Sequence, residues 1–257
     1  MSATVIAIAN QKGGVGKTTT TINLGAALAA TGRRTLLIDF DPQANLTVGL
    51  GMDVAAVEHS TANLLLDGGD LRQAIRPTAI PDLDIVPSTI ELAHTELQLN
   101  TAIGRERALR DLLGDRVQDG YRYILIDAPP TLGLLTVNAL VACDYVLVPV
   151  QTHFYALKGL THLFILVNTV KAKVNPGIAV LGLLATFHDG RTNLGRDMLD
   201  TLREAYPEYL LETVIRTATR VAEASLAGQP VRLYARSSES ARAYESLADE
   251  VIKRVEG

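Results

Sequence analysis

QKGGVGKTTT, residues 11–20, joins an apolar run to a segment with helical spacing. The run, residues 5–9, is typical of a buried strand, and residues 19–30 repeat apolar positions as a helix does. The three glycines between them let consecutive backbone N–H groups approach an anion closely. Lys17 supplies a cation for phosphates, and the hydroxyl of Thr18 is placed to ligate Mg²⁺. The stretch therefore predicts a phosphate-binding loop between a strand and a helix.

Strand-like and helix-like segments alternate along the rest of the chain. The predicted strands are residues 5–9, 35–39, 83–86, 123–127, 145–150 and 178–186. The predicted helices are residues 19–30, 105–117, 157–171, 194–206 and 238–255. Such alternation indicates a parallel sheet with both faces covered. We expect an α/β fold in which residues 1–257 form one domain, a mostly parallel twisted sheet with helices on both faces.

Turn and capping residues predict several boundaries. Gly32 is expected to end the first helix, and Ser88 and Glu91 have the spacing of a capping box that starts another. Residues 42–60 are the most loop-like part of the chain.

Composition narrows the class of protein. The chain has 47% hydrophobic residues and a formal net charge of −4, so any contact with nucleic acid requires a local basic patch. No apolar stretch approaches the ~20 residues of a membrane span, and the N-terminus lacks the features of a signal peptide. We therefore expect a cytoplasmic protein. The single cysteine, Cys143, is expected to be a buried core residue.

The loop departs from the common phosphate-loop motif. Gln11 stands where that motif has its first glycine, and a second lysine, Lys12, stands at the front of the loop. In these features the sequence resembles the deviant Walker A group of P-loop NTPases, which includes the ParA/Soj partition proteins, MinD and the nitrogenase iron protein. The resemblance implies an ATP site and a nucleotide-sandwich dimer in which Lys12 reaches the partner's phosphates. The nucleotide-binding residues that it implies are Lys12, Gly13, Gly14, Val15, Gly16, Lys17, Thr18 and Thr19.

Carboxylates follow two other predicted strands. LLIDFDPQAN (residues 36–45) contains Asp39 and Asp41, and YILIDAPPTLG (residues 123–133) contains Asp127. A carboxylate at a strand's end beside the loop can hold a Mg²⁺ water, which suits Asp127. The resemblance implies that Asp41 positions or activates the attacking water, with Lys12 and Lys17 as the other catalytic residues. It places Asp39 near the metal, together with Thr18 and Asp127. Turn or capping roles stay open for Asp39 and Asp41.

The resemblance is closest to the ParA/Soj type and covers nearly the whole chain. It implies a Mg²⁺-dependent ATPase with weak basal activity that binds ATP/ADP and dimerises on ATP binding. It also implies binding to non-specific double-stranded DNA and release when a ParB-like centromere-binding protein stimulates hydrolysis, hence a nucleoid-associated location. Because the loop begins so near the N-terminus, we expect no N-terminal DNA-binding domain. The candidate DNA-binding residues are Arg191, Arg220 and Arg216, with ordinary solvated arginines as the alternative.

Two features leave alternatives open. Residues 215–225 lack both prolines and the first arginine of the pattern Ile-Pro-Arg-Asn-x-x-Leu-x-Glu-Ala-Pro that many relatives carry, which leaves the adenine contacts undefined. The tail, residues 240–257, has an apolar stripe suited to docking on the domain, whereas its acidic residues oppose binding to anionic lipid. The alternatives are a MinD-like membrane-associated positioning ATPase and a nucleotide-gated scaffold with negligible turnover.

Overall fold

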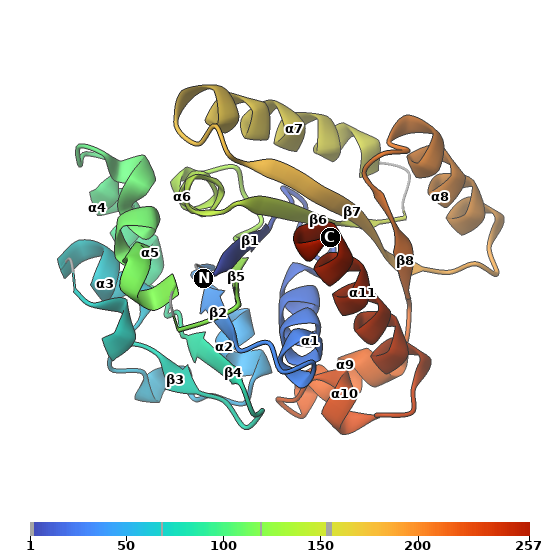
Figure 1. Ribbon diagram of the computed structural model, residues 1–257, viewed down its shortest axis with the longest axis horizontal. Helices are drawn as coiled ribbons and strands as arrows, with labels where there is room; N and C mark the ends of the chain where they lie inside the picture. Colours follow the sequence, from blue (N-terminus) through green and yellow to red (C-terminus); the bar gives the residue numbers. More distant parts are fainter. Residues whose placement is uncertain (1–2, 68, 119, 153–155) are drawn as a thin grey trace.

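A twisted sheet forms the centre of the molecule (Figure 1). The computed structural model describes residues 3–67, 69–118, 120–152 and 156–257, and within these ranges the sheet has eight strands in the order β3-β4-β2-β5-β1-β6-β7-β8. The strands are β1 (Thr4–Ile8), β2 (Thr35–Asp39), β3 (Arg76–Pro77), β4 (Leu83–Val86), β5 (Tyr123–Asp127), β6 (Tyr145–Gln151), β7 (Ala179–His188) and β8 (Leu210–Arg216). Only the β3–β4 pair among them is antiparallel. The predicted α/β class is confirmed.

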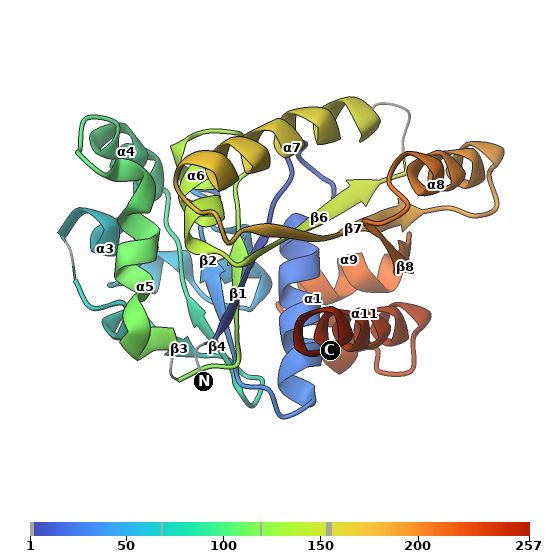
Figure 2. The same ribbon diagram turned by 45° about the horizontal axis from the view of Figure 1, so that its top comes forward.

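Helices cover both faces of the sheet (Figures 1 and 2). One layer contains α1 (Lys17–Ala30), α2 (Asn45–Gly49), α9 (Thr219–Leu226), α10 (Val231–Tyr234) and α11 (Glu239–Glu256). The other contains α3 (Thr61–Asp67), α4 (Glu91–Leu99), α5 (Ala108–Gln118), α6 (Leu134–Ala142), α7 (Ala156–Lys173) and α8 (Asn193–Ala205). Each layer buries its own apolar cluster against the sheet, as the continuous apolar runs of the central strands require.

The predicted strands and helices are present, but the structure also contains β3, α3, α6, α9 and α10, which were not predicted, and it differs from the prediction at three further places. The edge strand β8 was not predicted. It is only partly buried, and charged residues interrupt its apolar residues, so its sequence lacks a continuous apolar run. Residues 42–60 are not simply a loop, since they contain α2 and a short 3₁₀ turn, Val54–Ala56. The capping box does not form: α4 begins at Glu91 after Ile90, and Ser88 is buried with its backbone N–H bonded to the hydroxyl of Thr47.

The C-terminal helix docks on the domain. Its residues Ala241, Tyr244, Leu247 and Val251 are buried in the same cluster as α1. Cys143 is also buried, as expected. Among the described residues, no helix combines the length and apolar character needed to cross a bilayer.

The strand order brings the predicted site residues to one edge. In the sheet, β5 lies between β2 and β1, and Asp127 is in register with both Asp39 and Ile8. The carboxyl ends of β5 and, next to it, β2 therefore lie on one side of the loop that follows β1, which is where ligands bind in open α/β sheets.

Candidate functional site

The loop after β1 has the conformation that its glycines allow. Gly14 and Gly16 have φ angles of 70° and 86°, in the left-handed region that disfavours side chains. A Cβ atom on Gly16 would also lie 3.3 Å from Cε2 of Phe187. The hydroxyl of Thr186 donates to the carbonyl of Val15 at 2.8 Å, so the end of β7 holds the loop in place. α1 begins directly after Gly16 and presents its N-terminus to the loop.

Lys17 and Thr18 face the carboxylate of Asp127. The Thr18 hydroxyl donates to Oδ2 of Asp127 at 2.7 Å. Burial lowers the pKa of Lys17, while the nearby charges of Asp127 and Asp41 oppose that shift. Burial, followed by repulsion from Asp39, raises the pKa of Asp127 above its ordinary value. A cation beside Asp127 would relieve the cost of that buried charge.

The two carboxylates after β2 differ in surroundings. Asp39 is fully buried, and its Oδ2 accepts hydrogen bonds from the backbone N–H and the hydroxyl of Thr47, at 2.8 and 2.6 Å. Burial raises the pKa of Asp39 to about 7, although the bonds from Thr47 oppose the shift. Asp41 instead lines a cavity together with Lys17. Asp39 thus anchors α2, and Asp41 is the carboxylate that borders the cavity.

A cavity of about 630 Å³ opens over the loop. It is bounded by residues from the loop and α1, by Asp41, by Pro130 after β5 and by Leu226 on α9. A second cavity of about 410 Å³ adjoins it and is lined mostly by apolar atoms, including those of Phe187, Ile215 and Val221. Phe187 borders both cavities and has a φ of 48°, a strained conformation of the kind that clusters at functional sites. The sequence prediction missed Phe187, although its position at the end of β7 was a usable signal.

The donor set suits a magnesium ion better than a softer metal. A hydroxyl oxygen of Thr18 and a carboxylate oxygen of Asp127 lie side by side at the loop. Among the described residues, no group of three or more His, Cys, Asp or Glu side chains could hold a metal ion by itself. Mg²⁺ fits such a sparse set, because it usually completes its shell with substrate phosphates and water.

Lys12 lies at the front of the loop and reaches the neighbouring strand. Its Nζ donates to Oε1 of Gln151, at the end of β6, over 3.4 Å. Its carbonyl accepts from Nζ of Lys17 over the same distance. The stretch PVQTHFYALKGL, residues 149–160, also resembles the ParA/Soj type; of these residues, 153–155 lie outside the described part of the chain.

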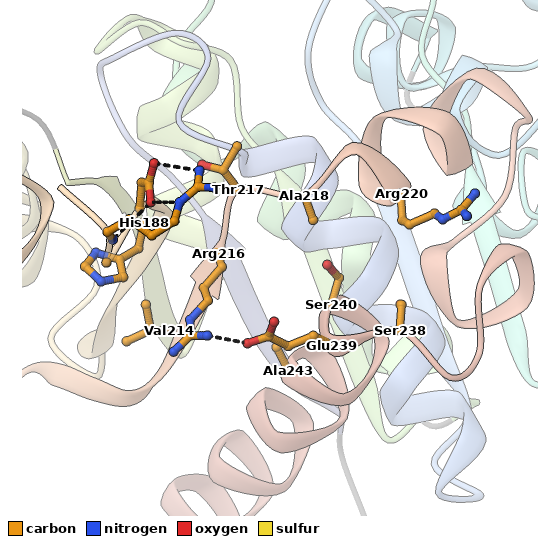
Figure 3. Close-up of a pocket in the computed structure, with 13 residues that line it drawn as sticks. His188, Val214, Arg216, Thr217, Ala218, Arg220, Ser238, Glu239, Ser240 and Ala243 are labelled. Atoms are coloured by element: carbon orange, nitrogen blue, oxygen red, sulfur yellow. Dashed lines mark hydrogen bonds and ion pairs between the residues drawn. The ribbon is translucent and has the colours of Figure 1, made fainter.

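The three arginines predicted to bind DNA come together around another cavity, of about 540 Å³ (Figure 3). Arg191 follows β7, Arg216 ends β8 and Arg220 lies in the first turn of α9. We call the cavity that these three line the arginine pocket. His188 also borders it, but burial and the charge of Arg216 lower the pKa of His188, which favours the neutral imidazole.

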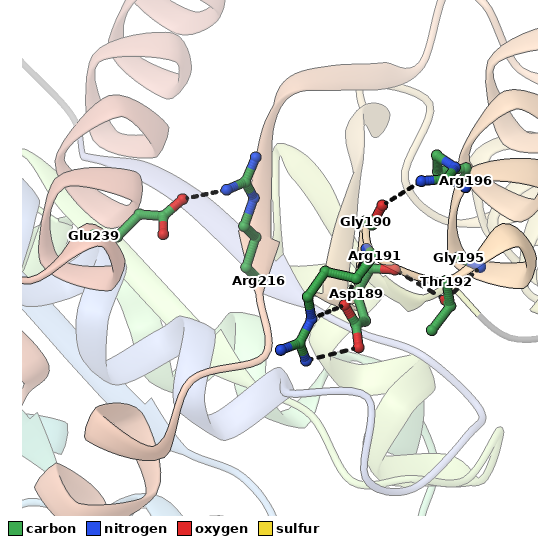
Figure 4. Close-up of polar contacts among 8 residues, drawn as sticks. All are labelled: Asp189, Gly190, Arg191, Thr192, Gly195, Arg196, Arg216 and Glu239. Carbon is green, nitrogen blue, oxygen red and sulfur yellow. Dashed lines mark hydrogen bonds and ion pairs between the residues drawn. The ribbon is translucent and has the colours of Figure 1, made fainter.

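Each of these arginines is bonded to a carboxylate. Arg191 Nε lies 2.8 Å from Asp189 Oδ1, and Arg216 Nη1 lies 2.7 Å from Glu239 Oε1 (Figure 4). Arg220 Nη1 lies 2.8 Å from Glu223 Oε2. The pair with Arg191 lowers the pKa of Asp189 to about 2.

Comparisons with known proteins agree with this geometry. A sequence profile described as an AAA domain matches residues 3–180. The sporulation initiation inhibitor protein Soj of Bacillus subtilis is 45% identical over 96% of this chain and 97% of its own. The chromosome partitioning protein ParA of Caulobacter vibrioides is 42% identical over 97% of this chain and 94% of its own. One solved structure, from Mycobacterium smegmatis, superposes on this chain with a TM-score of 0.87. It is described as cobyrinic acid a,c-diamide synthase with bound ADP and magnesium. The two chains are 34% identical, and the match covers 99% of this chain and 96% of that one.

Proposed function

Since this chain belongs to the ParA/Soj family of Mg²⁺-dependent P-loop ATPases that act in chromosome partitioning, we propose that ATP drives it into a dimer that binds DNA. The observation that carries the proposal is that Lys17, Thr18 and Asp41 line one cavity, with Asp127 bonded to Thr18 behind it. These are the groups that phosphoryl transfer to water needs, because its catalysis depends on positioning and charge stabilisation.

Each loop residue has a proposed role in ATP binding. Backbone N–H groups of Gly13–Thr19 surround the phosphates, and Lys17 contributes positive charge. Thr18 and Asp127 hold Mg²⁺, which when bound neutralises phosphate charge, while Asp39 acts near it by fixing the chain that carries Asp41. Asp41 orients the attacking water.

Lys12 completes the site of the partner subunit in this proposal. A cation delivered in trans stabilises the charge that develops on the transferred phosphoryl group, as an arginine finger does. The position of Lys12 supports this role, because its Nζ contacts Gln151 and Lys12 is not among the described residues that line the cavity over its own loop. Hydrolysis then depends on dimerisation.

The apolar cavity beside the loop is the proposed site of the adenine ring. It shares Gly16, Thr19 and Phe187 with the cavity over the phosphate loop, so a nucleotide can occupy both at once. Its lining also contains Arg216, Thr217 and Ala218, which line the arginine pocket as well. This shared wall offers a physical connection between nucleotide binding and the proposed DNA-binding face.

DNA binding is proposed to use Arg191, Arg216 and Arg220 of both subunits. Phosphate attraction of this kind is independent of base sequence and adds over the two copies in a dimer. A ParB-like centromere-binding protein would stimulate hydrolysis and release the dimer, and DNA binding would keep the protein on the nucleoid in the cytoplasm. In this scheme residues 1–257 act as a single ATPase domain.

The test is binding to non-specific duplex DNA with ATP, with ADP and without nucleotide, at two salt concentrations. Wild type should bind only with ATP and lose affinity as salt rises. Arg220→Glu should bind more weakly. Arg72→Glu is the matched control, because Arg72 also forms an ion pair with an aspartate but precedes β3, at the opposite edge of the sheet from β8. Absence of DNA binding in every nucleotide state would refute the proposal.

The same preparation separates the alternatives. ATP-dependent sedimentation with liposomes would favour a MinD-like membrane ATPase. A DNA-bound dimer whose turnover no ParB-like partner can stimulate would favour a nucleotide-gated scaffold.

A further inference from the structure

The arginine pocket is lined by carboxylates as well as by arginines, since Asp189 and Glu239 also border it. Arg191, Arg216 and Arg220 are each bonded to a carboxylate, at 2.8, 2.7 and 2.8 Å. Their side chains are nevertheless 90%, 64% and 60% exposed, so all three guanidinium groups remain accessible to a ligand from solvent.

Carboxylates and phosphates bind the same donors on a guanidinium group. Both present paired oxygens to its planar fork of N–H groups. Ion pairs as exposed as these contribute little to stability, so their exchange for a phosphate costs little. A DNA phosphate approaching the pocket therefore competes with the carboxylate already in place.

The pair between Arg216 and Glu239 has a geometry that the other two lack. Arg216 ends β8 and Glu239 begins α11, so this pair joins two elements across the arginine pocket (Figure 3). Glu239 lies in the first turn of α11, where the helix dipole stabilises a carboxylate even after its arginine has turned away. The ion pair can therefore break while the helix dipole still stabilises the negative charge of Glu239.

We propose that Glu239, together with Asp189 and Glu223, is an intramolecular competitor of DNA phosphate. These carboxylates weaken the hold of one subunit on DNA, so that stable binding requires the summed arginines of a dimer. The proposal rests on the proposed DNA-binding function of this pocket and adds a group of acidic residues that regulate it.

Charge-neutralising variants test it through DNA affinity in the presence of ATP. Glu239→Gln and Asp189→Asn should each bind non-specific duplex DNA about two- to thirty-fold more tightly, because an exposed pair is worth little and a dimer presents it twice. The dependence of DNA affinity on salt should also become steeper in these variants. In wild type, the carboxylate that DNA displaces takes up a cation from solution, and this uptake offsets part of the counterion release from DNA; the variants lack that carboxylate. Circular dichroism and ATP-induced dimerisation, measured on each variant, show whether the fold is retained.

Asp70→Asn is the matched control. Asp70 bonds the backbone N–H and the guanidinium of Arg72 as Asp189 does those of Arg191, but it lies next to β3, at the far edge of the sheet. The Asp70→Asn variant loses the same charge as the pocket variants, but at a position far from the arginine pocket. Its DNA affinity should therefore stay at the wild-type value. An equal gain in Asp70→Asn would mean that net charge alone is responsible and would overturn the proposal.

A double-mutant cycle isolates the pair itself. In an Arg216→Gln background, Glu239→Gln should bring no further gain, because the competitor then has no arginine to hold. A gain that persists without Arg216 overturns the proposal. If wild type binds DNA with ATP and neither acidic variant binds more tightly, this inference alone fails; if neither wild type nor the variants bind DNA, the proposed function fails with it.

Discussion

At the scale of single residues, neighbouring carboxylates with similar sequence context have different surroundings. Asp39 and Asp41 are two positions apart, yet Asp39 is bonded to Thr47 and Asp41 borders the cavity over the phosphate loop. The strand motif predicted both as site residues, because side-chain alternation places them on the same side of the strand. Which one faces the ligand depends on α2, a helix that the loop-like composition of residues 42–60 concealed.

Substitution of Asp41 should separate ATP binding from hydrolysis. We expect Asp41→Ala to bind ATP, dimerise and remain on DNA, while its partner-stimulated kcat falls by at least about a hundred-fold, the usual effect of removing a group that positions or deprotonates a nucleophile. Lys17→Ala is the comparison variant and should lose ATP binding itself. Nucleotide binding and phosphate release, measured on both, check this. Normal turnover in Asp41→Ala would remove Asp41 from the proposed mechanism.

At the scale of elements, the C-terminal helix is held at both its apolar face and its end. Glu256, at the end of α11, accepts hydrogen bonds from Arg33, Arg122 and the hydroxyl of Tyr123. Arg33 precedes β2, and Arg122 and Tyr123 lie at the start of β5, so all three are far from Glu256 in sequence. Their contacts fix the end of α11 beside the amino-terminal ends of these two strands. A helix held in this way differs from a tail free to lie on a membrane.

The Glu256 contacts predict a defined pH dependence of stability. The bonds from Arg33, Tyr123 and Arg122 lower the pKa of Glu256 to about 2, below its ordinary value of 4.5. A carboxylate with a lowered pKa in the folded state stabilises the fold above the unfolded pKa and loses that contribution as pH falls through the folded one. Glu256→Gln should therefore lower the free energy of unfolding by about 1 kcal/mol at pH 7, and its difference from wild type should shrink between about pH 4.5 and 2.

Urea unfolding at several pH values measures this difference. Glu208→Gln is the control, since Glu208 is exposed and has no ion pair within the described ranges. A difference that stays constant with pH would mean that the charge of Glu256 does not stabilise the fold.

At the scale of the whole molecule, the proposed function requires two subunits. The phosphate loop, Asp41 and Asp127 come from one chain, whereas Lys12 is proposed to act in the site of the other. Within the single subunit, Lys12 contacts Gln151 at the end of β6. Under this proposal, each chain supplies an ATP site of its own and a catalytic lysine for its partner.

Mixing two inactive variants tests this arrangement. Lys12→Ala and Asp41→Ala should each have little stimulated ATPase activity alone. A mixed dimer contains one site with an intact Asp41 and a Lys12 from the partner, so an equal mixture should recover about a quarter of wild-type activity in a symmetric dimer that exchanges freely. ATPase assays across mixing ratios check the recovery. Activity that never exceeds that of the separate variants would place Lys12 in its own subunit's site.

The sequence by itself determined the local features of this protein. The glycines and lysines of residues 11–20, the apolar runs ending in Asp39 and Asp127, and the stripe along α11 each act over a few neighbouring residues, so strand, loop and helix follow from spacing. Only the tertiary structure decided the strand order, the pairing of Arg216 with Glu239 and the contacts of Glu256 with Arg33 and Arg122. Such contacts join distant parts of the chain, as between Thr186 and Val15, 171 residues apart. No local pattern encodes them, because they form only when the packed sheet brings the ends of its strands together.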